Sequence, residues 1–180
     1  GAAARLIVCG IREDGPTLGL EAALLAAAWA DRGVVGYDIA GGEVGNPATD
    51  FAAAYAVAAD AGLGRTVHAG EMDGIESVAS ALTVDPDRIG HGWRLVDDLD
   101  GPVAAEVRDR GLPLEVCVTS NACLGLPVED HPVRRLFEAG FVVTATPDDR
   151  AITTTTTSRE PALWAEHHGI SDEELAALQH

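Results

Sequence analysis

Short apolar runs rich in β-branched residues alternate along the chain with longer segments rich in alanine and leucine. The short runs predict strands at residues 6–11, 34–39, 65–68, 88–90, 114–118 and 141–144, each covered on both faces. The longer segments predict helices at 18–31, 50–61, 74–81, 102–110 and 132–139, with another beginning near Ser158. Ser171 and Glu174 have the spacing of a capping box. This alternation predicts an α/β domain with a parallel sheet, either doubly wound or part of a barrel.

Composition limits the size of the fold and the material of its core. The 180 residues amount to one domain, and 47% of them are hydrophobic but only 4% aromatic. We therefore expect a core built from alanine, valine, leucine and isoleucine. No apolar run approaches the roughly 18 residues of a membrane span, so the sequence gives no indication of a transmembrane helix.

The charge balance excludes several classes of partner and reaction. Asp and Glu number 29 against 12 basic residues, all of them arginine, which gives a net charge of −17. Such a surface repels nucleic acids and anionic membranes. The absence of lysine excludes Schiff-base chemistry, and the three cysteines have no Cys-x-x-Cys spacing. These features favour a reducing, cytoplasmic location.

Polar side chains follow strand after strand in the predicted sheet. His68 and Glu71 follow one strand, His91 follows the next, and Asp148 and Asp149 follow the last. In parallel α/β folds the carboxyl ends of the strands carry the working residues. Imidazole and carboxylate groups gathered at one sheet edge are ligands for a divalent metal, with further carboxylates left for proton transfer. A satisfied core histidine or a helix-capping aspartate explains any one of these positions equally well, but not the whole series.

The motifs that contain these residues resemble the adenosine deaminase family of the amidohydrolase superfamily. They are Gly36-Tyr37-Asp38-Ile39-Ala40-Gly41, Thr66-Val67-His68-Ala69-Gly70-Glu71, Arg88-Ile89-Gly90-His91-Gly92, Leu114-Glu115-Val116-Cys117 with Thr119-Ser120-Asn121, His131-Pro132, and Asp148-Asp149. The resemblance runs from about Arg5 to the C-terminus. It implies a TIM-type (β/α)8 barrel that hydrolyses the 6-amino group of a purine and releases ammonia.

By that resemblance, His68 and Asp148 would be zinc ligands. Glu71 would give a proton to the purine ring nitrogen N1, and His91 would orient and help deprotonate the attacking water. Asp149 and the backbone of Gly41 would bind the purine. His131 would be structural. The implied cofactor is therefore zinc, and the implied partner is a small purine.

The sequence departs from the family pattern at the metal site. The family takes two further zinc ligands from a His-x-His at the end of its first strand, and no His-x-His occurs in this chain. Thr146-Pro147 stands where Asn-Thr is usual, and Val118 where proline is usual. Residues 6–11 correspond to the family's third strand, and about six of the eight βα units are present, since a barrel needs about 250 residues. We expect residues 1–180 to be a C-terminal portion of one barrel domain.

Three functional hypotheses follow. The first is a deaminase of adenosine or deoxyadenosine; the second is a deaminase of another aminopurine, such as adenine or a modified adenine nucleoside. The third is an inactive deaminase-like fragment that acts as an interaction module. If the chain is complete, the open sheet edge must be covered by a partner or by another copy of the chain, which makes a homo-oligomer one of the expected arrangements.

Overall fold

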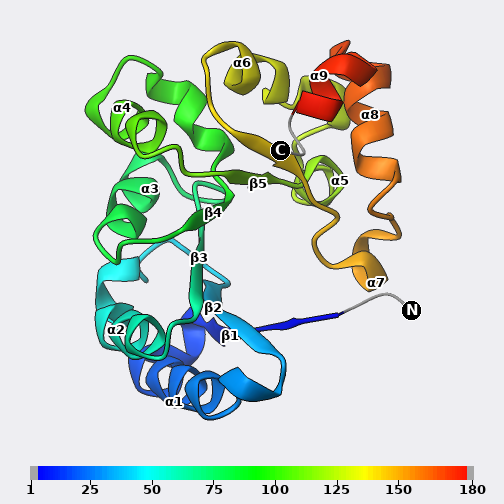
Figure 1. The fold of residues 1–180 in the computed structure, drawn as a ribbon. Helices are drawn as coiled ribbons and strands as arrows, with labels where there is room; N and C mark the ends of the chain where they lie inside the picture. Colours follow the sequence, from blue (N-terminus) through cyan, green and yellow to red (C-terminus); the bar gives the residue numbers. More distant parts are fainter. Residues whose placement is uncertain (1–3, 178–180) are drawn as a thin grey trace. The chain divides into compact units, whose positions relative to one another are not determined.

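The computed structural model describes residues 4–177 and divides the chain into two compact units, Gly1–Gly90 and His91–His180. Strands and helices alternate along the first unit, and the second unit ends in successive helices (Figure 1). Among the described residues, no helix is both long and apolar enough to cross a membrane.

The first unit is built on parallel strands with helices between them. Its strands are β1 (Leu6–Ile11), β2 (Val34–Ala40), β3 (Gly64–Ala69) and β4 (Arg88–His91), the last ending on the first residue of the second unit. Its helices are α1 (Gly15–Ala28), α2 (Ala52–Asp60) and α3 (Ile75–Leu82). β2 pairs in parallel with both β1 and β3, and Figure 1 shows α1 and α2 on the same side of these strands. This arrangement brings the carboxyl ends of β2 and β3 to one edge of the sheet.

In the second unit the strands are shorter, and successive helices lie between and after them. Its elements are α4 (Pro102–Asp109), β5 (Leu114–Val116), α5 (Val118–Cys123), α6 (Val133–Glu138), β6 (Val143–Ala145), α7 (Arg150–Thr153), α8 (Arg159–His168) and α9 (Asp172–Ala177). β5 and β6 pair in parallel. α9 begins with the predicted capping box, in which Glu174 N donates to Ser171 Oγ at 3.2 Å and Ser171 N donates to Glu174 Oε2 at 2.7 Å.

The expectation from composition is largely confirmed, whereas two expectations from the pattern are wrong. Most buried hydrophobic side chains are Ala, Val, Leu or Ile, although Tyr37, Tyr55, Phe51 and Trp164 are among the largest fully buried side chains. β1 is not covered on both faces, since most of its side chains are exposed and its pairing among the described residues is with β2 alone. The segment predicted as a strand at 114–118 ends at Val116, and Val118 already belongs to α5.

Candidate metal and deaminase site

His68 lies near the end of β3, beside a buried carboxylate from β2. Its Nδ1 is 2.9 Å from Oδ2 of Asp38, whose side chain is 9% exposed. A carboxylate next to Nδ1 favours the proton on that nitrogen and leaves Nε2 with its lone pair. Histidines that bind metals are commonly held in this way by an acidic group. Asp38 is in the Gly36–Gly41 motif, but sequence reasoning gave it no role.

Gly90 of β4 keeps space open next to His68. A Cβ built at Gly90 would lie 3.1 Å from both Cα and Nδ1 of His68. Such contacts are closer than ordinary van der Waals packing, and the neighbouring Cα belongs to backbone that shifts with difficulty. Gly90, although it directly precedes His91, therefore leaves room for His68 of the preceding strand. This accounts for one of the glycines next to the polar positions.

Glu71 lies in the loop between β3 and α3, and a second glutamate holds that loop. Glu43 is 3% exposed, and its carboxylate accepts hydrogen bonds from the backbone amides of Gly70, Glu71 and Met72. Arg12, which is 1% exposed, donates to the carbonyl oxygens of His68 and Asn46. Sequence reasoning missed both Arg12 and Glu43, because neither stands in the motif that contains its partners.

Gly41 has φ +96°, which places it in the backbone region that favours glycine. The side chain of Glu13 lies against it, and Glu13 Oε1 accepts a hydrogen bond of 2.7 Å from the amide of Gly42. This hydrogen bond lowers the pKa of Glu13. The backbone that the resemblance assigns to purine binding thus lies next to an exposed carboxylate.

In the second unit, a neutral hydrogen-bond network fixes His91. Val133 N donates to His131 Nδ1 at 3.2 Å, so His131 carries its proton on Nε2, which lies 3.1 Å from Asn121 Oδ1. Asn121 then turns its Nδ2 toward His91 Nδ1 at 3.4 Å. Burial, followed by the charge of His168, lowers the pKa of His131 to about 3. His131 is therefore neutral, and it has the structural role that was predicted.

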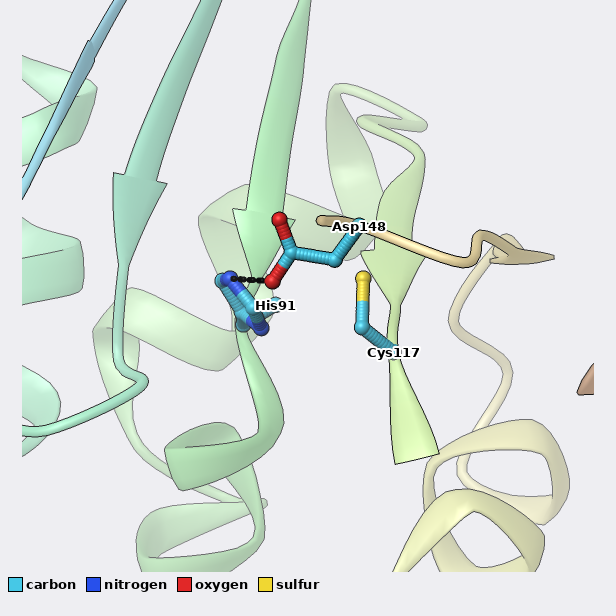
Figure 2. Close-up of side chains that lie close together, drawn as sticks. All are labelled: His91, Cys117 and Asp148. Atoms are coloured by element: carbon cyan, nitrogen blue, oxygen red, sulfur yellow. Dashed lines mark ion pairs between the residues drawn. The ribbon is translucent and has the colours of Figure 1, made fainter. Parts of the chain in front are cut away.

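The network determines which nitrogen of His91 is available. A ring that accepts at Nδ1 carries its proton on Nε2 when it is neutral. Such a ring presents an N–H at Nε2, which can orient an oxygen by donating to it. Nε2 lies 3.8 Å from Oδ2 of Asp148 (Figure 2). His91 is almost fully buried, whereas the side chain of Asp148 is 22% exposed.

Figure 2 shows His91, Asp148 and Cys117 gathered in the second unit. One donor atom from each lies within 4.8 Å of the others. His91 and Asp148 are both non-glycine residues with positive φ, +62° and +54°, a conformation that concentrates at functional sites. Cys117 is buried and donates to the carbonyl oxygen of Glu115. Its position near two predicted site residues was not foreseen, because the cysteine spacing gave no sign of a metal site.

The predicted site residues fall into two groups, each within one unit. Gly41, His68 and Glu71 belong to the first unit, where Asp38 and Glu43 support them. His91, Asp148 and Asp149 belong to the second, where His91 and Asp148 approach one another. Asp149 is exposed and precedes α7, and its carbonyl oxygen accepts a hydrogen bond from Ile152 N.

Each group, taken by itself, contains side chains of the kinds that bind zinc. His68 offers Nε2 while Asp38 lies beside Nδ1, and Asp148 offers a partly exposed carboxylate. Imidazole nitrogen and carboxylate oxygen are both ordinary zinc ligands.

Comparison with known proteins connects this site to a family. The family model described as Adenosine deaminase matches residues 1–180. The chain is 45% identical over 181 aligned residues to an adenine deaminase of Rhizobium leguminosarum bv. trifolii and 40% identical to one of Agrobacterium fabrum. The alignments cover 99% and 97% of this chain but 56% and 54% of those relatives, so the chain spans about half their length.

Solved structures give the same picture. An adenine deaminase from Arthrobacter aurescens matches 97% of this chain, and 53% of its own, with a TM-score of 0.86 and 30% identity. An amidohydrolase from Burkholderia ambifaria with bound Zn matches 99% of this chain, and 50% of its own, with a TM-score of 0.85 and 28% identity. The N6-methyl-AMP deaminase of Arabidopsis thaliana matches 97% of this chain, and 51% of its own, with a TM-score of 0.82 and 27% identity.

These likenesses confirm the prediction of a TIM-type barrel class with about six of its eight βα units in this chain. Together with the match of the family model over residues 1–180, they confirm the resemblance found in the motifs. The chain belongs to the adenosine deaminase family.

Proposed function

We propose that this chain forms the larger part of the catalytic barrel of a zinc-dependent aminopurine deaminase, with adenine as the preferred substrate. The observation that carries the substrate is the 38–45% identity with eight relatives named adenine deaminase, over 97–99% of this chain. Adenosine is the second candidate, because the matching family model is described as Adenosine deaminase. The reaction replaces the amino group with oxygen and releases ammonia.

His68 and Asp148 would hold the zinc ion. When bound, zinc supplies Lewis-acid chemistry that makes a water nucleophilic at neutral pH. Asp38 would keep the His68 ring in the orientation and tautomer that metal binding requires, since it lies 2.9 Å from Nδ1. The remaining ligands would come from a His-x-His in polypeptide outside this sequence, so an intact mass above 18.6 kDa is expected for the natural protein.

The other residues would bind the purine and manage protons. Glu71 would donate a proton to the ring nitrogen next to the reacting carbon, which requires its carboxyl to be protonated when substrate is bound. His91 would orient the attacking water through Nε2. Asp149 and the backbone of Gly41 would position the purine ring.

The test compares ammonia release from adenine and adenosine by the purified protein, together with its zinc content. Glu71→Gln is expected to retain zinc and lose at least about 100-fold in kcat, because it removes the proton donor. The exposed Glu76→Gln is the matched control and is expected to behave as the wild type. His68→Ala is expected to lower zinc content itself, whereas the exposed His167→Ala is not.

Three results would each contradict a part of the proposal. Unchanged turnover in Glu71→Gln would remove Glu71 from its role. Zinc near zero with no ammonia from either purine would instead favour the alternative of an inactive deaminase-like unit. Faster deamination of adenosine than of adenine would make adenosine, and not adenine, the preferred substrate.

A further inference from the structure

The carboxylate of Glu43 binds three successive backbone amides of one loop. Oε2 accepts from Gly70 N at 2.7 Å, and Oε1 accepts from Glu71 N and Met72 N at 3.0 Å each. The loop lies between β3 and α3, where these amides have no sheet or helix to join. Successive amides that converge on one anion form a strong, directional site, because hydrogen bonds to an ionised acceptor are the stronger ones.

The central amide of the three belongs to Glu71. The Cα of Glu71 is therefore fixed between two neighbours whose amides are also hydrogen-bonded. The loop begins directly after β3, the strand that contains His68. Gly70 has φ +66°, so the loop turns sharply where the first of these bonds forms. Glu43 thus determines where the Glu71 side chain starts, without having to touch a substrate.

Arg12 adds two hydrogen bonds to the backbone of the same region. Its Nη2 donates to the carbonyl oxygen of His68 at 2.6 Å, and its Nη1 donates to the carbonyl oxygen of Asn46, in the loop that carries Glu43. Burial lowers the pKa of Arg12, and the charge of Glu43 is the largest effect that opposes this change. One buried cation and one buried anion therefore tie the loop after β2 to the residues at the end of β3.

We infer that Glu43 is a positioning residue that holds Glu71, through its backbone amide, in the place required for proton transfer to the purine. Arg12 supports Glu43 in this role. The catalytic part of the inference rests on the proposed function, whereas the effect on the loop does not. A displacement of about 1 Å in a catalytic group costs about 100-fold in rate, which sets the size of the expected effect.

The chemistry of the site requires a carboxylate of this length. Glutamine offers one acceptor oxygen and one NH2 group in place of the two carboxylate oxygens. Its NH2 group would therefore face at least one backbone N–H, which is also a donor. Aspartate keeps the charge but is one methylene shorter and does not reach all three amides at once. Glu43→Gln and Glu43→Asp therefore disturb the same contacts by different means.

The experiment measures amide hydrogen exchange at residues 70–72 and steady-state kinetics with adenine, in the full protein. In Glu43→Gln, exchange at these amides is expected to be at least about 10-fold faster, and kcat about 100-fold lower, with KM within about threefold and zinc content unchanged. Glu43→Asp is expected to show the same pattern with smaller changes. Glu76→Gln removes an equal charge from the exposed start of α3 and is the matched control.

Unchanged exchange at residues 70–72 in a folded Glu43→Gln protein would overturn the inference. So would a kcat equal to that of the wild type in a variant whose exchange has changed. If Glu43→Gln does not fold, Glu43→Asp decides by the same two measurements. If the wild type deaminates no purine, the proposed function fails, while the exchange data still determine whether Glu43 holds the loop.

Discussion

Among the described residues, each unit fully buries one glutamate, and the two glutamates are held by different chemistry. Glu43 in the first unit accepts from three backbone amides and lies in the field of the buried Arg12. Glu160 in the second unit is fully buried and accepts from the hydroxyls of Thr119 and Thr155, with one longer bond from Thr119 N.

The difference shows how firmly each glutamate fixes its surroundings. Backbone amides are placed by the chain itself, so an anion that gathers three of them fixes the course of a loop. Hydroxyl groups rotate, so Thr119 and Thr155 satisfy the charge of Glu160 without imposing one backbone path. Glu43, held by backbone amides, supports the loop that carries Glu71. Glu160, held mainly by hydroxyl groups, joins the start of α8 to α5.

The largest effect is expected from removing the cation of the first unit. Arg12→Leu leaves Glu43 buried without its compensating charge and leaves the carbonyl oxygens of His68 and Asn46 without their donor. Leaving a buried acceptor without its donor costs about 1–3 kcal/mol. Two carbonyl oxygens lose their donor here, so we expect the free energy of unfolding to fall by about 2–6 kcal/mol. Urea denaturation measures it. Arg5→Leu, at an exposed position, is the control and should change stability by less than about 0.5 kcal/mol.

If Arg12→Leu costs no more than Arg5→Leu, the first unit does not depend on a buried cation. The contrast between the two glutamates would then lie in their hydrogen bonds alone.

The sequence directed attention to polar residues at or near strand ends, but not to the residues that hold them in place. His68, Glu71, His91 and Asp148 are such residues, and they remain candidates for the site. Glu43 was not predicted as a support, because its partners are backbone amides 27–29 residues away. Almost every residue has a backbone amide, so such a partner cannot be recognised from residue type. Arg12 also binds backbone oxygens.

The threonine run at residues 153–157 gives a similar lesson in the second unit. Thr153 ends α7, and residues 154–157 lie between α7 and α8. Only the structure shows that Thr155 is buried and bonded to Glu160. A repeated residue type conceals which member of the repeat has a specific partner.

A smaller effect is expected from Thr155→Val, which tests the hydroxyl side of the comparison. The change preserves shape and removes the 2.8 Å hydrogen bond to Glu160. Hydrogen bonds to charged groups contribute about 1.5–3 kcal/mol, and the expected loss in unfolding free energy lies in that range. Thr157→Val, in the same run but exposed, is the control. Equal stability of the two variants would show that Thr119 alone satisfies Glu160.

The smallest effect concerns the neutral network around His91. The pKa of His131 is about 3 in the folded protein and 6.5 without the fold. Between these values the unfolded chain binds a proton that the folded chain does not, so stability falls as the pH falls through this window. From pH 7 to pH 5.5 the loss is about 1 kcal/mol for this one group.

His131→Gln is expected to remove that part of the pH dependence while keeping a donor toward Asn121. Some slope remains, because burial also lowers the pKa of His168. The measurement is the free energy of unfolding at pH 7 and pH 5.5, with the exposed His167→Gln as control. An unaltered pH dependence in His131→Gln would mean that folding does not lower the pKa of His131, so that His131 takes up a proton in the folded protein as readily as in the unfolded chain. The network would then present a charge toward Asn121 and would no longer be neutral.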